Sequence, residues 1–209
     1  MAISKLVAKQ LGCPTGLLSR YAAFTWNRRN AALNNTAFDM LALQASDRVL
    51  EVGFGGGYLI QRMIPLVTEG IITGIDHSDA LIGYAQKRFR TAVCSGRLEL
   101  KCATAEALPY PDHHFSKAVS VNSIFYWQDI RQGLREIHRV LNIQGILVVC
   151  FTCKDSLEKK LFAQAIQLFD SRDLEQALAQ SGFQNITTAT FSDPYRQYIC
   201  MTAEKPSEV

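Results

Sequence analysis

The stretch Val49-Leu50-Glu51-Val52-Gly53-Phe54-Gly55-Gly56-Gly57 joins a short apolar run to a glycine-rich turn. Glycine lets the backbone turn sharply and lets a ligand come close where a Cβ would otherwise stand. A helix-length segment, Tyr58 to Val67, follows the turn, and the first N–H groups of a helix are free to meet a ligand. The stretch therefore predicts a strand–loop–helix unit that binds a small molecule.

The acid at Glu51 separates two kinds of ligand. A dinucleotide-binding loop reads G-x-G-x-x-G, because a pyrophosphate lies directly on the start of the helix. In this chain the last of those glycines is replaced by Tyr58, and Glu51 stands two residues before Gly53. A carboxylate repels a pyrophosphate and attracts a cation, so the loop favours a cationic ligand.

Short apolar runs alternate with helix-length segments on both sides of this loop. Strands are expected at 49–52, 71–75, 98–102, 118–121, 146–151, 186–191 and 198–201, and helices at 17–33, 58–67, 78–90, 130–141 and 157–180. Such an order predicts an α/β sheet covered on both faces, with ligands beyond the carboxyl ends of its strands. We divide the chain into a helical lid segment (1–45), a main domain (46–204) and a loose tail (205–209).

The second expected strand ends at Asp76, 23 residues after Gly53. An acid about 20 residues beyond a glycine loop can accept hydrogen bonds from the ribose hydroxyls of an adenosine. Sites for NAD use the same device, so Asp76 indicates an adenosine without naming the cofactor. Ser78 or Asp79 is expected to cap the next helix. His77 fits either an exposed loop histidine or a neighbour of the adenosine.

Four stretches together resemble the motifs of class I, Rossmann-like S-adenosylmethionine-dependent methyltransferases, most of all their type 11 group. They are Glu51-x-Gly53-x-Gly55-x-Gly57, Gly74-Ile75-Asp76-His77-Ser78, the segment 103–110, which resembles G-D-A-E-x-L-P-F, and the segment 135–147, which resembles R-E-x-x-R-V-L-K-P-G-G-x-L. Two positions depart from the family pattern. Thr104 stands where an aspartate normally accepts from the adenine amino group, and Ser116 replaces an aspartate near the start of the strand that precedes Asn122.

The resemblance implies a doubly wound, mostly parallel seven-stranded sheet with an antiparallel final hairpin, helices on both faces and an N-terminal helical lid. It implies S-adenosyl-L-methionine as cofactor and S-adenosyl-L-homocysteine as product. The expected cofactor-binding residues are Glu51, Gly53, Phe54, Gly55, Gly57, Asp76, His77, Thr104, Ala105, Glu106 and Asn122. The expected lid and substrate residues are Tyr21, Trp26, Asn30, Phe125, Tyr126 and Trp127.

The expected activity is in-line transfer of a methyl group to an oxygen, nitrogen or carbon atom of a small-molecule acceptor. Much of the catalysis can come from placing the reactants, so a base is not required. If one is used, it is sought among Tyr126, His77 and Tyr21, whereas His113 and His114 are more typical of a surface turn. Two alternatives remain open: a module that binds S-adenosylmethionine without turnover, and a nicotinamide-dependent oxidoreductase.

Composition narrows the partners further. The net charge of +3 gives no indication of a nucleic-acid partner, and the basic spots at 28–29 and 87–90 are expected to be solvated helix faces. No apolar run approaches the roughly 18 residues of a membrane span, and no signal peptide is visible, so a cytoplasmic location is expected. Six cysteines, including the Cys150–Cys153 spacing, lack the companion ligands of a zinc site. We expect reduced structural thiols and no metal.

Overall fold

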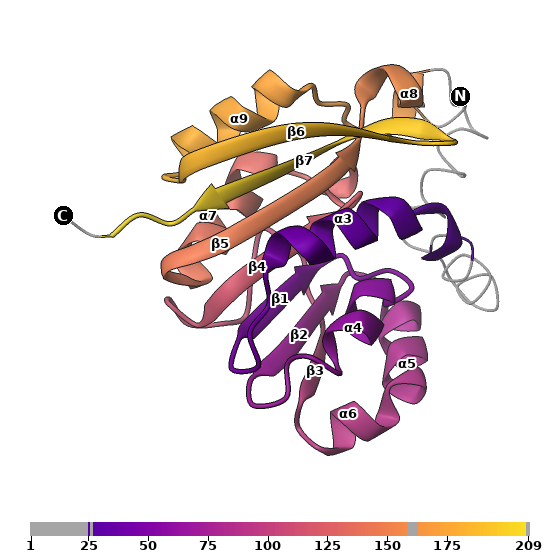
Figure 1. The fold of residues 1–209 in the computed structure, drawn as a ribbon, viewed down its shortest axis with the longest axis vertical. Coiled ribbons are helices and arrows are strands. Elements are labelled where there is room, and N and C mark those ends of the chain that lie inside the picture. The colour runs from indigo at the N-terminus through magenta and orange to yellow at the C-terminus, as the bar shows by residue number, and fades with distance from the viewer. Residues whose placement is uncertain (1–24, 26, 159–162, 208–209) are drawn as a thin grey trace.

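The computed structural model describes Thr25, residues 27–158 and residues 163–207 (Figure 1). The helices are α3 (Ala31–Leu41), α4 (Tyr58–Met63), α5 (Asp79–Arg88), α6 (Arg90–Cys94), η1 (Ile124–Tyr126), α7 (Ile130–Val140), α8 (Lys154–Glu158), η2 (Ala163–Ala165) and α9 (Ser171–Gln180). The strands are β1 (Arg48–Val52), β2 (Ile71–Asp76), β3 (Leu98–Cys102), β4 (Phe115–Val121), β5 (Leu141–Thr152), β6 (Gln184–Asp193) and β7 (Arg196–Glu204).

The strands form one sheet in the order β3-β2-β1-β4-β5-β7-β6. Strands β1 to β5 pair in parallel, whereas β7 is antiparallel to both β5 and β6. The predicted mostly parallel sheet with a reversed final hairpin is therefore confirmed. Because β7 runs backwards, its first residues lie at the same edge of the sheet as the carboxyl ends of the parallel strands.

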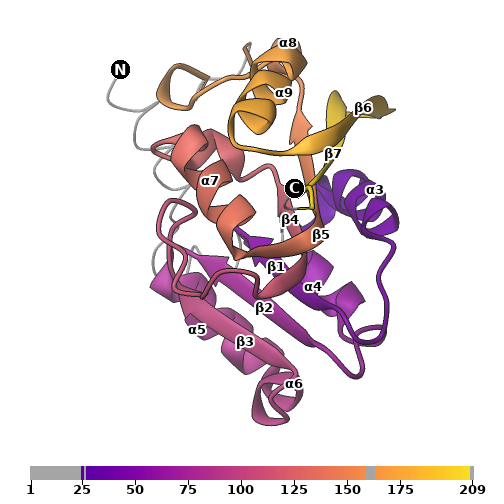
Figure 2. The same cartoon turned by 90° about the vertical axis from the view of Figure 1, so that its left-hand side faces the viewer.

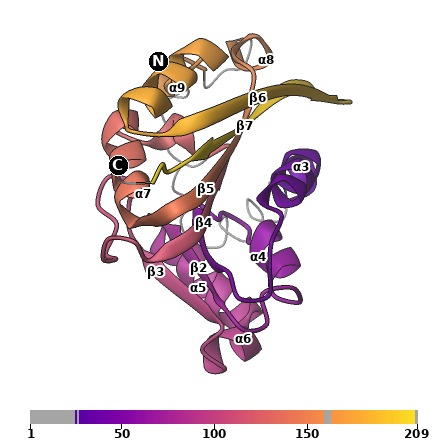
Figure 3. The ribbon, with the colours of Figure 1, turned by 60° about the vertical axis from the view of Figure 1, so that its left-hand side comes forward.

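Helices cover both faces of the sheet, as predicted. Figures 2 and 3 show α3 and α7 on opposite sides of β4 and β5. On one face, α3, α4 and α5 bury an apolar cluster that includes Leu33 and Ile60. On the other face, α7 and α9 bury a second cluster that includes Leu134 and Leu174. The sheet is thus a rigid platform between two cores, and its loops are free to form a site.

Two helices differ from the sequence expectation. The single helix expected over 157–180 is instead divided into α8, η2 and α9. A capping box starts α9: the Asp170 carboxylate accepts from the Asp173 N–H at 2.9 Å, and the Asp173 carboxylate accepts from the Asp170 N–H at 3.2 Å. This reciprocal pair satisfies N–H groups that a helix start leaves open, so it fixes the boundary. The helix expected over 17–33 falls largely outside the described residues; residues 27–29 are helical as expected, and α3 begins at Ala31 after a turn at Asn30.

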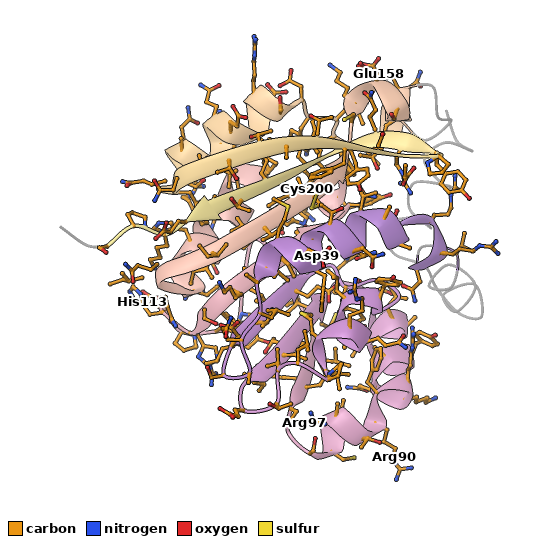
Figure 4. The ribbon with its side chains drawn as sticks, in the orientation of Figure 1. Asp39, Arg90, Arg97, His113, Glu158 and Cys200 are labelled. Atoms are coloured by element: carbon orange, nitrogen blue, oxygen red, sulfur yellow. A yellow bond between two sulfur atoms is a disulfide. The ribbon has the colours of Figure 1, made fainter. Side chains whose placement is uncertain are left out.

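The cysteines differ as well. Cys150 and Cys200 form a disulfide between β5 and β7, whereas we expected reduced thiols. They stand opposite each other in the antiparallel register, with their Cα atoms 4.1 Å apart, and both are fully buried in the cluster beneath α3 (Figure 4, which labels Cys200). Strand register, not the spacing along the sequence, brings the two sulfur atoms together. Cys153 remains a free thiol.

The C-terminal segment is anchored further than expected. Lys205, placed by the sequence in a loose tail, is only 6% exposed. Its Nζ donates to the Leu141 carbonyl at 2.8 Å and to the Arg139 carbonyl at 3.3 Å. The last strand is therefore fastened where α7 passes into β5. None of the helices in the described part of the chain has the length and apolar character needed to cross a bilayer.

Candidate functional site

A cavity of about 400 Å³ lies at the carboxyl ends of the parallel strands. Its walls come from the loops after β1 to β5, from residues 27–34 and from the hairpin residues at the start of β7. This size falls within the range of roughly 300–1,000 Å³ that is usual for small-molecule sites. The cavity lies at the edge of the sheet where the sequence predicted a ligand.

The wall contains every expected cofactor residue except Gly57: Glu51, Gly53, Phe54, Gly55, Asp76, His77, Thr104, Ala105, Glu106 and Asn122. Gly57 has a φ of +72° as the N-cap of α4, and a Cβ there would lie 2.7 Å from the ring of Phe89. Its lack of a side chain therefore serves the packing of α4 against the end of α5. Gly56 and Tyr58 line the cavity in its place.

Close packing joins the glycine loop to the loop after β4. Gly53 has a φ of +76°, and a Cβ on it would lie 2.4 Å from the Cβ of Ser123. The Ser123 hydroxyl donates to the Val52 carbonyl at 2.9 Å and accepts from the Trp127 indole N–H at 3.2 Å. Only glycine allows this approach. The contact brings the acid of the first loop and the amide of Asn122 to one cavity.

Glu51 is a buried carboxylate that is incompletely satisfied. Its side chain is 3% exposed, and Oε2 has no hydrogen-bond partner among the described residues. Burial, and then the charge of Asp76, raise the pKa of Glu51 well above its ordinary value, although the Ile60 N–H acts in the opposite direction. A buried carboxylate ionises readily only beside a positive charge. The residue is therefore suited to a cationic ligand.

Asp76 is held in place by the loops on either side of it. Its carboxylate accepts from the Gly55 N–H at 3.1 Å and from the Ser78 N–H at 3.0 Å. Burial raises the pKa of Asp76, and these N–H groups oppose the rise. Ser78 caps α5, as expected, through its hydroxyl and the Leu81 N–H. His77 is 43% exposed, with Nδ1 3.7 Å from Asp76 Oδ1, at the rim of the cavity.

Asn122 connects three segments that are distant in sequence. Its Oδ1 accepts from the Thr152 N–H at 2.8 Å and from the Thr152 hydroxyl at 3.1 Å. Its Nδ2 donates to Asn30 Oδ1 at 3.1 Å. The backbone φ of Asn122 is +54°, a region that asparagine tolerates better than most residues. The side chain thus ties the ends of β4 and β5 to the segment before α3.

The loop after β3 also reaches the cavity, although its acid, Glu106, already accepts hydrogen bonds from the backbone. The Glu106 carboxylate accepts from the Gln128 N–H at 2.6 Å and from the Asp129 N–H at 3.3 Å. It therefore holds the loop that leads into α7. Thr104, which departs from the family pattern, is exposed on the cavity wall beside Ala105.

The aromatic run after β4 both seals the core and lines the cavity. Phe125 and Trp127 are 5% and 7% exposed, and both contribute to the cluster beneath α7 while facing the cavity. Burial raises the pKa of Tyr126 to about 12. Its hydroxyl therefore keeps its proton near neutral pH and is a hydrogen-bond donor, not a base.

The remaining base and lid candidates differ in whether they lie on the cavity wall. Tyr21 and Trp26 lie outside the described residues, whereas Asn30 lines the cavity. His113 and His114 lie before β4, and their backbone N–H groups donate to the carbonyls of Arg139 and Val140. Figure 4 shows His113 at the end of the sheet opposite Glu158, which belongs to the helix after β5. Neither histidine is part of the cavity wall.

Several cavity residues carry no motif that marked them in advance: Asn27, Arg29, Asn34, Thr152, Ser156, Leu157, Ile166, Tyr195 and Arg196. A signal was nevertheless present for Tyr195 and Arg196. They lie between the strands expected at 186–191 and 198–201, where the final hairpin must turn, and a reversed last strand must begin at the ligand-binding edge.

A model of the methyltransferase domain, type 11, matches residues 50–149, which include the glycine loop, Asp76 and Asn122. Residues 50–149 therefore form a class I S-adenosylmethionine-dependent methyltransferase domain. The cofactor of this methyltransferase is S-adenosylmethionine, and the unpaired Glu51 oxygen on the cavity wall fits the positive charges of that molecule.

Relatives agree with this assignment. The methyltransferase is 26% identical over 186 residues to the uncharacterized methyltransferase YdaC of Bacillus subtilis (strain 168), a match that covers 89% of this chain and 98% of YdaC. It is 28% identical over 141 residues to 2-methyl-6-phytyl-1,4-hydroquinone methyltransferase 1 of Oryza sativa subsp. japonica, covering 66% of this chain and 42% of that protein. Its fold is similar to a crystal structure of a SAM-dependent methyltransferase from Thermotoga maritima, with a TM-score of 0.69, 20% identity, and coverage of 90% and 96% of the two chains.

Proposed function

We propose that this enzyme transfers the methyl group of S-adenosylmethionine to a small-molecule acceptor by in-line displacement. In that reaction an electron pair of the acceptor attacks the methyl carbon, the electrons of the breaking C–S bond stay on sulfur, which leaves S-adenosylhomocysteine, and the proton that the acceptor loses passes to water. The plant relative, which is named as a hydroquinone methyltransferase, supports a small acceptor. So does the volume of the cavity.

The observation that carries this proposal is the buried, unpaired oxygen of Glu51. In our proposal Glu51 meets the cationic amino acid part of the cofactor, and Asp76 accepts from the ribose hydroxyls. His77, Thr104 and Ala105 border the adenosine. Asn122 lies beside the methionine part, because it follows β4, the strand that pairs with β1 and its Glu51.

The second half of the cavity would hold the acceptor. Phe125, Tyr126 and Trp127 offer it an apolar wall, together with Leu157 and Ile166. In this half the Tyr126 hydroxyl keeps its proton near neutral pH, because burial raises its pKa to about 12. Positioning and the exclusion of water are therefore the main contributions of the protein.

Calorimetry tests the cofactor half. The enzyme should bind S-adenosylmethionine and S-adenosylhomocysteine, and NAD should bind far more weakly. The Glu51→Gln variant keeps the shape of the side chain and removes its charge, so its affinity for S-adenosylmethionine should fall about tenfold or more, as for the loss of one charge-assisted hydrogen bond. Tight binding of NAD, or an unchanged affinity in the variant, would refute the assignment.

Turnover tests the transfer itself. The enzyme is incubated with S-adenosylmethionine and a panel of phenols, hydroquinols, amines and carboxylic acids, and S-adenosylhomocysteine is measured. An acceptor-dependent release of S-adenosylhomocysteine, with a methylated product of matching mass, supports the proposal. Binding of the cofactor without turnover of any compound in the panel would count against it.

A further inference from the structure

Charge is divided between the two ends of the cavity. The acids Glu51 and Asp76 lie on β1 and β2, at the end assigned above to the cofactor. Arg29 and Arg196 line the cavity at the other end, where β5 and β7 meet. β4 and β5 separate β1 from β7, so the two ends lie roughly 14 Å apart at the ordinary spacing of neighbouring strands.

Several contacts hold the Arg196 side chain at this end of the cavity. Its guanidinium donates to the Thr152 hydroxyl at 3.2 Å and to the backbone carbonyl of Arg29. Its Nε lies 3.6 Å from Asp193 Oδ2, a distance too long for a hydrogen bond, so this buried N–H has no acceptor among the described residues. The side chain is 14% exposed. Burial is the main reason why the pKa of Arg196 is lowered.

Arg29 adds a second positive charge beside it. Arg29 is an exposed residue of the cavity wall, and its charge further lowers the pKa of Arg196. No carboxylate in the described part of the chain forms an ion pair with Arg29, whereas Asp193 faces Arg196. Among the described residues, Arg196 is therefore paired with Asp193, whereas the charge of Arg29 has no ion-pair partner.

We propose that this end is an anion subsite that binds a carboxylate group of the methyl acceptor. The inference rests on the proposed function and specifies its substrate class. The unpaired charge of Arg29 matches a monoanion, and a planar guanidinium matches the two oxygens of a carboxylate. An amine acceptor would meet repulsion there.

The geometry also separates recognition from reaction. The carboxylate would lie against Arg29 and Arg196, whereas the methyl-accepting atom would lie nearer Asn122, which is hydrogen-bonded to Thr152 between the two ends. Phe125 and Tyr126 would face the apolar part of the molecule. The preferred acceptor is therefore a small organic acid whose nucleophilic atom is not part of the carboxylate.

A matched set of probes tests this subsite. The full chain, saturated with S-adenosylhomocysteine, is titrated by calorimetry with 4-hydroxybenzoate, with its methyl ester and with tyramine, which share a phenol and differ in charge. 4-Hydroxybenzoate should bind about tenfold more tightly than the ester, as expected for one charge-assisted contact, and tyramine should bind most weakly. This preference should weaken as salt is added.

Two variants locate the effect. Arg29→Gln should remove the preference for 4-hydroxybenzoate and leave the affinity for S-adenosylhomocysteine unchanged. Arg28→Gln is the control, because Arg28 is exposed and has the same charge but is not part of the cavity wall. Arg196→Lys keeps the charge but not the fork of hydrogen bonds, and should weaken the preference in part.

Equal binding of the three probes, no binding of 4-hydroxybenzoate at millimolar concentration, or an unchanged preference in Arg29→Gln would overturn the subsite. The proposed function is judged separately, by the turnover panel. A carboxylate preference without any turnover would leave the subsite standing and remove the transfer. Turnover without a carboxylate preference would support the methyl transfer and refute the subsite.

Discussion

Asn122 donates a hydrogen bond to Asn30 across 92 positions of sequence, and the same side chain accepts twice from Thr152. One amide thereby joins the segment before α3 to the ends of two central strands. Its left-handed backbone, with a φ of +54°, aims the side chain at both partners. Residues close to the cavity mouth are thus positioned by the sheet itself.

We predict that Asn122→Gly and Asn122→Ala both weaken S-adenosylmethionine binding, because both remove the amide. They should differ in stability. Glycine adopts a positive φ freely, whereas alanine there adds about 1–2 kcal/mol of backbone strain. Urea unfolding should therefore rank the wild type above Asn122→Gly and Asn122→Gly above Asn122→Ala. An Asn122→Gly protein with unchanged cofactor affinity would show that the amide has no part in the site.

The raised pKa of Glu51 predicts how stability depends on pH. In the unfolded chain this carboxyl group titrates near its ordinary value of 4.5, and in the folded chain it titrates well above it. Ionisation therefore costs the folded state stability as pH rises above 4.5, and the full cost is reached once pH passes the raised pKa. Without cofactor, Glu51→Gln should have a higher Tm than the wild type at mildly alkaline pH.

Below pH 4.5 the two melting temperatures should converge, because the wild-type carboxyl group is then neutral in both states. Saturating S-adenosylmethionine should reverse the order at alkaline pH, since its cation stabilises the ionised carboxylate of the wild type only. Parallel Tm curves across the whole pH range would contradict the buried-carboxylate account.

Gly53→Ala should lower the free energy of unfolding for two reasons, and the same substitution at Gly96 separates them. Gly96 has nearly the same φ, +74° against +76°, but a Cβ there meets nothing within 4 Å. Gly96→Ala should therefore be destabilised only by the added backbone strain, about 1–2 kcal/mol. Gly53→Ala should lose a further 1–3 kcal/mol or so through its collision with Ser123. Equal losses in chemical denaturation would mean that the two loops are not closely packed.

Lys205→Met should destabilise the fold by about 2 kcal/mol, because it removes charge-assisted hydrogen bonds to the Leu141 and Arg139 carbonyls. Lys87→Met is the matched control, since Lys87 is exposed on α5. It should change the free energy of unfolding by less than about 0.5 kcal/mol. A similar effect of both variants would show that the terminal lysine contributes no specific anchor.

Local patterns predicted most of the sheet and much of the cavity wall. The glycine loop, Asp76 and the Ser78 cap each stand at a strand end or helix start that a local pattern marks, and the structure places all three at those positions. Ser116 shows why a departure from a motif is not always a departure at the site. It lies near the start of β4, where its hydroxyl donates to Asp47 at 2.7 Å, away from the cavity.

Local sequence patterns could not predict the features that depend on the register between distant strands. The Cys150–Cys200 disulfide requires β7 to pair with β5 at one particular offset. Arg196 reaches the cavity only because its strand is reversed. The break before α9 depends on a reciprocal contact between Asp170 and Asp173, which competes with the helical periodicity over 157–180.

The reversed direction of β7 has a consequence for how such an enzyme can change. Its hairpin supplies Tyr195 and Arg196 to the cavity, whereas Glu51 and Asp76, which we propose bind the cofactor, come from strands on the far side of β4. If the proposed division of the cavity holds, insertions or substitutions in the hairpin would change the choice of acceptor while the residues proposed to bind the methyl donor stay intact. New specificities can arise on this scaffold through a peripheral loop, without rebuilding its centre.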